Sequence, residues 1–186
     1  FPYTTLFRSF IIAVSLIFLT IMLYIDLVMH FVGVEFREGA QIVPILLMAN
    51  LCLGVYFNLS IWYKLTSKTV YGAAIAIGGA FITITINYLW IPEIGYMASA
   101  WATLICYFTM MVVSYWLGQI HYPINYHVLK GIGYPVAAFA LYYISTLISQ
   151  PDGNYHFLIN TVILLLFVGT VYKLEKPKLA ASNSVK

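Results

Sequence analysis

The chain has 186 residues, of which 62% are hydrophobic and 8% charged, and its formal net charge is +3. A soluble domain usually carries about a quarter charged residues, so this composition excludes a water-soluble globular domain and favours a membrane protein. Most of the positive charge comes from Lys outside the apolar runs, which points to orientation in a lipid bilayer rather than to nucleic acid. Cys52 and Cys106 lie inside apolar runs, and their spacing suggests neither a disulfide nor a zinc site.

The first nine residues, FPYTTLFRS, precede the first long apolar run. They match the in-frame translation of TTT CCC TAC ACG ACG CTC TTC CGA TCT, the end of a common short-read sequencing adapter. We therefore expect residues 1–9 to be adapter-derived, native sequence to begin at Phe10, and Arg8 to be left out of the charge pattern.

Six apolar segments follow, each long enough to span a bilayer, which takes about 20 residues at about 1.5 Å of rise per residue. Short polar breaks separate them, so successive helices should be antiparallel neighbours. The sequence thus predicts an all-α polytopic membrane protein with a polar tail over 174–186. The expected spans are about 10–34, 41–63, 69–91, 94–118, 128–149 and 155–173.

Basic residues mark the direction of these spans, because short cytoplasmic loops carry an excess of Lys and Arg. With six antiparallel helices, seven Lys residues fall on one side and Arg37 falls on the other, together with four acids. The first helix should therefore start in the cytoplasm, and the C-terminus should end there. The seven are Lys64, Lys68, Lys130, Lys173, Lys176, Lys178 and Lys186.

Small residues recur at helical spacing in several segments, which is typical of helices that pack closely in lipid. In the third segment the predicted packing face consists of Gly72, Ala76, Ala80, Thr83 and Asn87.

Three amide side chains, Asn50, Asn58 and Asn87, lie inside apolar runs. Each needs a partner helix, water or a ligand, because lipid satisfies no hydrogen bond. Bonds between helices and a polar substrate path are the two interpretations.

Asp26 is the only acid inside a span. Ionisable groups within a membrane often mark a pathway, so Asp26 is a candidate for ion coupling. The alternatives are a structural hydrogen bond, or a side chain that snorkels to the interface near His30.

Lys64 ends the second segment beside Trp62 and Tyr63. That arrangement is typical of an anchor at the membrane interface. The alternative is a cation at the cytoplasmic mouth of a path, where it would attract a phosphate.

Enzyme signatures are absent from the sequence: it contains no GxSxG, HExxH, P-loop or paired-carboxylate pattern. The four His residues are scattered over segment ends and loops. The sequence therefore favours a transporter over an enzyme, with no bound cofactor.

One block of the chain has a more specific pattern. It includes VPILL at Val43–Leu47, GVYFNLSIWYKLTSKT at Gly54–Thr69, Ile91-Pro92 before Gly95, and ASAWAT at Ala98–Thr103. These pieces resemble the C-terminal region of bacterial polysaccharide flippases of the multidrug/oligosaccharidyl-lipid/polysaccharide exporter superfamily. The resemblance extends over about residues 10–173 and is densest over 43–125.

The resemblance implies the last six of about fourteen helices of a flippase, with an N-terminal lobe outside this sequence. It implies alternating access that carries a polyprenyl-pyrophosphate-linked oligosaccharide across the bacterial inner membrane, coupled to H⁺ or Na⁺. Asn50, Asn58 and Asn87 would then line the substrate path, Lys64 would attract the pyrophosphate, and Asp26 would bind the coupling ion. A glycan polymerase is a possible partner. The rival interpretations are a multidrug or peptidoglycan-precursor exporter of the same superfamily, and a membrane enzyme of glycan assembly.

Overall fold

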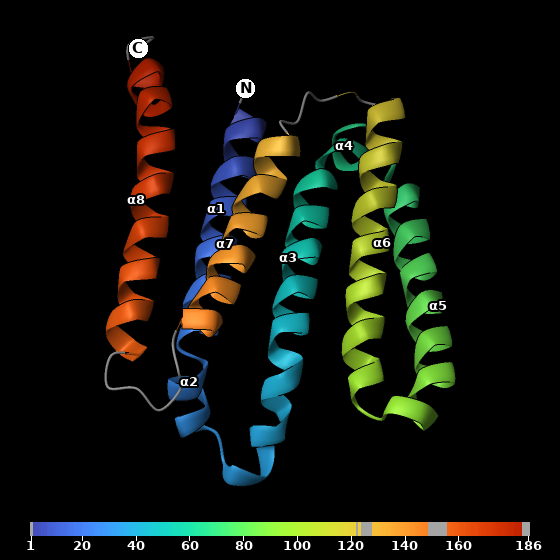
Figure 1. Cartoon of the computed structure of the whole chain (residues 1–186). Helices are drawn as coiled ribbons and strands as arrows, with labels where there is room; N and C mark the ends of the chain where they lie inside the picture. The colour runs from blue at the N-terminus through green and yellow to red at the C-terminus, as the bar shows by residue number, and fades with distance from the viewer. Residues whose placement is uncertain (1, 122, 124–127, 149–155, 184–186) are drawn as a thin grey trace. The chain divides into compact units, whose positions relative to one another are not determined.

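The computed structural model describes residues 2–121, 123, 128–148 and 156–183 (Figure 1). Within these residues every regular element is helical, which confirms the predicted all-α class. One element, η1, is a 3₁₀ helix and the others are α-helices. They are α1 (Pro2–Leu23), α2 (Ile25–Phe31), η1 (Val34–Ile42), α3 (Val43–Leu59), α4 (Ile61–Leu65), α5 (Thr69–Ile94), α6 (Met97–His121), α7 (Val128–Ile148) and α8 (His156–Asn183).

Five described helical stretches are long and apolar enough to cross a membrane. A sixth is obtained if Phe7–Leu23 and Ile25–Phe31, which are bent by 71°, count as one span. These findings confirm the prediction of a multi-pass membrane protein. The five are Arg37–Leu65, Thr69–Ile94, Met97–His121, Gly131–Ile148 and Phe157–Glu175.

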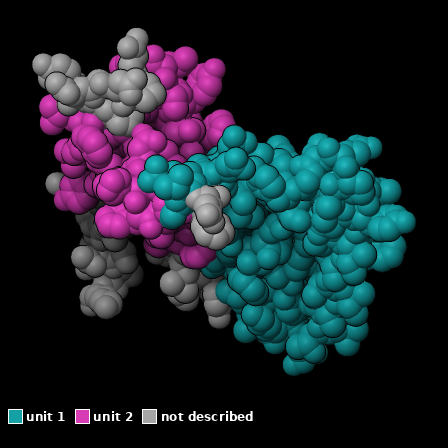
Figure 2. Space-filling view, turned by 90° about the horizontal axis from the view of Figure 1, so that it is seen from below, with its two compact units in different colours: residues 1–7, 33–127 teal, residues 8–32, 128–186 magenta. Residues whose placement is uncertain are grey.

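The chain divides into two compact units, which Figure 2 distinguishes by colour. Unit 1 comprises Phe1–Phe7 and Gly33–His127, and it contains η1 and α3 to α6. Unit 2 comprises Arg8–Val32 and Val128–Lys186, and it contains most of α1 together with α2, α7 and α8.

In unit 1, α6 packs against both α3 and α5 (Figure 1). The contact with α5 is close because Gly79 has no side chain: the Cys106 thiol donates a hydrogen bond to the Gly79 carbonyl at 3.3 Å. The buried positions of α5 are Ile75 and Gly79, whereas Ala76 is exposed.

The predicted packing face of α5 is therefore wrong in the middle of the helix, where the buried residues are Ile75 and Gly79 in place of Ala76 and Ala80. Ala76 and Ala80 are both exposed. The reason is steric. The sulfur side chains of α6, Cys106 and Met110, pack against Gly79, which has no Cβ, and not against Ala80, which has one.

The α5–α6 turn lies later than the sequence predicts. The helix continues through Pro92 to Ile94, and Gly95 ends it with a φ of +60°. Proline is tolerated here because it removes only one hydrogen bond close to the end of the helix, and Gly95 takes the positive φ without the strain that a Cβ would bring.

In unit 2, α1 is joined to α7 and α8 by side chains. The rings of Phe18 and Phe139 lie 6.4 Å apart, and Phe18, Leu19, Ala138 and Phe167 are buried. The first span is not one helix: the sequence predicts a single segment over 10–34, but the structure breaks it at Tyr24, and η1 begins at Val34.

Candidate functional site: a polar stripe on α3 and α4

Four of the polar or small residues of the second span lie on one side of it. We call Asn50, Gly54, Asn58 and Lys64 the polar stripe. Asn50 and Lys64 are exposed, and Gly54 and Asn58 are partly exposed. The spacing of four residues keeps Asn50, Gly54 and Asn58 on one side of α3, and Lys64 follows in α4. The buried residues of α3 are Ala49, Leu51, Cys52, Val55, Tyr56 and Leu59, whereas Phe57 is exposed like the stripe.

The two amides of the stripe make hydrogen bonds to their own helix. Asn50 Nδ2 donates to the Leu46 carbonyl at 2.9 Å, and Asn58 Nδ2 donates to the Gly54 carbonyl at 3.0 Å. An amide has two N–H donors and an acceptor oxygen, so these bonds use one donor of each side chain. Among the residues that the structure describes, neither amide bonds to another helix. The stripe therefore presents hydrogen-bonding groups outward from an apolar span.

Asn87 has a different environment. Ser99 Oγ donates to Asn87 Oδ1 at 3.1 Å, which joins the end of α5 to the start of α6. Of the residues expected along a substrate path, the structure thus brings Asn50, Asn58 and Lys64 to one side of one span. It places Asn87 in an interhelical bond.

Trp62 and Tyr63 differ from the expected interfacial anchors, because their side chains are only 2% and 7% exposed. Trp62 Nε1 donates to the Ser114 carbonyl at 3.2 Å, and its ring stacks on His121 with centroids 5.4 Å apart. The physical reason is space on α6: a Cβ at Gly118 would lie 2.9 Å from Trp62 Cδ1. The two aromatic side chains therefore pack inside unit 1 and not on its surface.

Lys64 stays on the outside of this aromatic cluster. It lies in the last turn of α4 and is exposed. A cation is favourable at the C-terminal end of a helix, where the carbonyl groups carry partial negative charge.

Asp26 belongs to unit 2 and lies in the first turn of α2, two residues after the break at Tyr24. Its side chain is exposed, and its charge interacts with the Tyr142 phenol of α7. His30 follows one turn later in the same helix.

A fourth intramembrane amide, Asn160, is missing from the sequence-based candidates although the same signal was available: it lies within an apolar run. It is 1% exposed. Ser145 Oγ of α7 donates to Asn160 Oδ1 at 2.7 Å, and Asn160 Nδ2 of α8 donates to the Leu23 carbonyl of α1 at 2.6 Å. This amide therefore connects the three long helices of unit 2.

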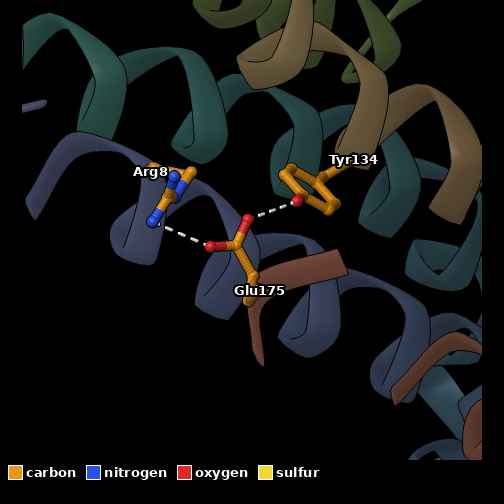
Figure 3. A network of polar contacts seen from close by, with 3 residues as sticks. All are labelled: Arg8, Tyr134 and Glu175. Atoms are coloured by element: carbon orange, nitrogen blue, oxygen red, sulfur yellow. Dashed lines mark hydrogen bonds and ion pairs between the residues drawn. The ribbon is translucent and has the colours of Figure 1, made fainter. Parts of the chain in front are cut away.

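A second polar connection joins the same three helices (Figure 3). Arg8 Nη2 of α1 lies 2.8 Å from Glu175 Oε2 of α8, and the Tyr134 hydroxyl of α7 donates to Glu175 Oε1 at 2.7 Å. The sequence pattern did not indicate this network. Arg8 belongs to the segment expected to be adapter-derived, so we assign it no part in function.

A groove of about 350 Å³ runs along α8, lined by Val162, Leu165, Leu166, Gly169, Thr170 and Lys173. It is open and largely apolar, unlike a ligand site, which closes around a few convergent polar groups. The described part of the chain contains no cluster of three or more His, Cys, Asp or Glu residues that could hold a metal ion.

Comparison of the chain with protein-family models, with curated proteins and with solved structures finds no match.

Proposed function

We propose that this chain is the C-terminal portion of a flippase that moves a polyprenyl-pyrophosphate-linked oligosaccharide across the bacterial inner membrane by alternating access. The observation that carries the proposal is the polar stripe: two amides and a cation on the outward side of a span whose opposite side is buried.

The physical chemistry of the stripe supports a path rather than lipid contact. Polar side chains inside a membrane generally face a bundle interior or a water-filled cavity, because lipid leaves their hydrogen bonds unmade. Asn50 and Asn58 each keep a donor and an acceptor that match sugar hydroxyl groups. The lipid tail of the substrate would remain in the bilayer while its sugars pass along the stripe.

Lys64 supplies the charge that the pyrophosphate requires. From the Lys pattern of the loops we propose that this end of the span lies in the cytoplasm, along with the C-terminus. An exposed ammonium group at the cytoplasmic mouth would attract the phosphate groups of the loaded lipid before the sugars enter. The resemblance is densest here, since Asn58 and Lys64 both lie within the GVYFNLSIWYKLTSKT run.

Asp26 is the residue we assign to ion coupling. It is the acid that lies inside the six spans expected from the sequence, and it lies two residues after a helix break at Tyr24. Broken membrane helices and intramembrane acids recur at the ion sites of transporters, where H⁺ and Na⁺ are the usual coupling ions. The partner that we propose for this activity is a glycan polymerase that receives the exported repeat unit.

The proposal is tested by glycan export in bacteria that depend on the protein carrying this segment. Lys64→Ala, Asp26→Asn and the double variant Asn50→Leu/Asn58→Leu should each reduce export while the protein stays folded in the membrane. Phe81→Ala is the matched control, because Phe81 is 72% exposed on α5 and carries no polar group. Normal export in the double variant would refute the path, and resistance to drugs without any glycan export would favour the multidrug exporter.

A further inference from the structure

The first span breaks at Tyr24, where its own sequence has none of the residues at which helices usually kink sharply. The bend is 71°, and residues 20–28, TIMLYIDLV, contain no Pro, Gly or Ser. Sharp kinks in helices arise at Pro, at Gly/Ser pairs, at π-bulges or where another side chain enters the ladder of backbone hydrogen bonds. Bonds of the ordinary α-helical spacing flank the break, from Tyr24 N to the Thr20 carbonyl and from Val28 N to the Tyr24 carbonyl, so a π-bulge is excluded.

A side chain from another helix does enter the ladder at this point. In a continuous α-helix the Leu23 carbonyl would accept a bond from the backbone N–H of Leu27. Here Asn160 Nδ2 donates to that carbonyl at 2.6 Å. Leu23 is the last residue of α1, so this bond lies at the bend.

The Asn160 amide is held in one orientation. Its oxygen accepts the Ser145 hydroxyl at 2.7 Å, and both side chains are almost completely buried, at 1% and 3% exposure. The next residue of α8 adds a second contact with the break, because the Thr161 and Tyr24 hydroxyl groups share a hydrogen bond at 2.8 Å. An amide fixed in this way imposes its position on the helix that it contacts.

We infer that Asn160 is a positioning residue that holds the first span in its bent form. It thereby determines where α2, and Asp26 within it, lie relative to α7 and α8. The inference goes beyond the flippase proposal and does not depend on it, since it concerns the shape of unit 2 and not what the protein transports.

The bend can be measured between two spin labels in the full chain, reconstituted in lipid nanodiscs. Ala13 on α1 and Phe31 on α2 suit the labels because both are exposed. With a rise of about 1.5 Å per residue, the two positions would be about 27 Å apart along a straight helix. With the observed bend between the two helices, the same rise places them about 22 Å apart. Double electron–electron resonance on the labelled chain with Asn160 intact should give the shorter distance.

Asn160→Leu and the milder Asn160→Ala should both lengthen the distance by about 5 Å, or spread it towards the straight-helix value. Ser145→Ala should broaden the distribution, because the amide loses the group that orients it. Asn50→Leu is the matched control, since Asn50 is an intramembrane amide that bonds its own helix. If Asn160→Leu does not fold, Asn160→Ala decides. An unchanged distance in a folded Asn160 variant, or an equal change in the Asn50 control, would overturn the inference.

Discussion

Two adjacent glycines of α5 allow a direct test of how α5 packs on α6. A Cβ added at Gly79 would lie 2.7 Å from Met110 Sδ and 3.0 Å from Cys106 Sγ, whereas a Cβ at Gly78 would meet nothing within 4 Å. Gly79→Val and Gly78→Val change the helix propensity in the same way, so the difference between them isolates the packing. The Met110 side chain can move aside, but Cys106 is buried, so the valine must push the helices apart.

We expect Gly79→Val to lower the free energy of unfolding by about 1–3 kcal/mol, the usual cost of overfilling a packed site. Gly78→Val should change it by no more than about 0.5 kcal/mol, as at other exposed positions. Reversible unfolding in mixed detergent micelles measures both.

A second readout reports on the contact itself. Cys106 is 5% exposed, and its thiol bonds to the Gly79 carbonyl. In a background with Cys52→Ala, Gly79→Val should speed the reaction of Cys106 with a maleimide, and Gly78→Val should not. Equal loss of stability in the two variants, or an unchanged Cys106 rate in Gly79→Val, would refute the packing described for α5 and α6.

Two further predictions concern the buried Trp62 ring and the ion pair between Arg8 and Glu175. Trp62→Ala should cost about 3–5 kcal/mol in the same unfolding measurement, as expected for removing a buried Trp ring. Trp116→Ala removes a ring that is 64% exposed, and it should cost less than about 1 kcal/mol. Similar losses in the two would contradict the buried cluster. Arg8→Ala should destabilise this chain more than the double variant Arg8→Ala/Glu175→Gln, because the single change removes the positive charge beside a largely buried carboxylate. Strictly additive effects in a double-mutant cycle would contradict a coupled pair.

The length and composition of the apolar segments predict the class of the fold because a helix must satisfy its own backbone in lipid. They do not predict which side of α5 meets α6. Gly72, Ala76 and Ala80 form one possible small-residue face of α5. Gly72 and Gly79, with Ile75 between them, form another, and the structure buries Ile75 and Gly79. The choice depends on the sulfur side chains of the partner helix, which no pattern within α5 contains.

Some features of the candidate site and of the first span can likewise be predicted from the sequence, and others cannot. The spacing of four residues along the sequence is enough to predict that Asn50, Gly54 and Asn58 share a side of α3. It is not enough for Lys64, which lies six residues after Asn58 in α4. The bend of the first span is not predictable locally, because Leu23 and the Asn160 that contacts it are 137 residues apart in the chain. The sequence also leaves open whether Trp62 lies at a membrane interface or in a core, since only the space beside Gly118 decides.

The central claim is that the polar stripe borders a water-filled path and not lipid. Single cysteines are introduced as Asn50→Cys, Asn58→Cys and Phe81→Cys, with Cys52 and Cys106 replaced by Ala, in the protein carrying this segment in intact membranes. A charged methanethiosulfonate reagent reacts only with thiols that meet water, and a lipid-soluble maleimide confirms that each thiol is present and reactive. We predict that the charged reagent modifies the two stripe positions and leaves the position on α5 unmodified. Protection of both stripe positions, or reaction at Phe81→Cys at the same rate, would contradict the account.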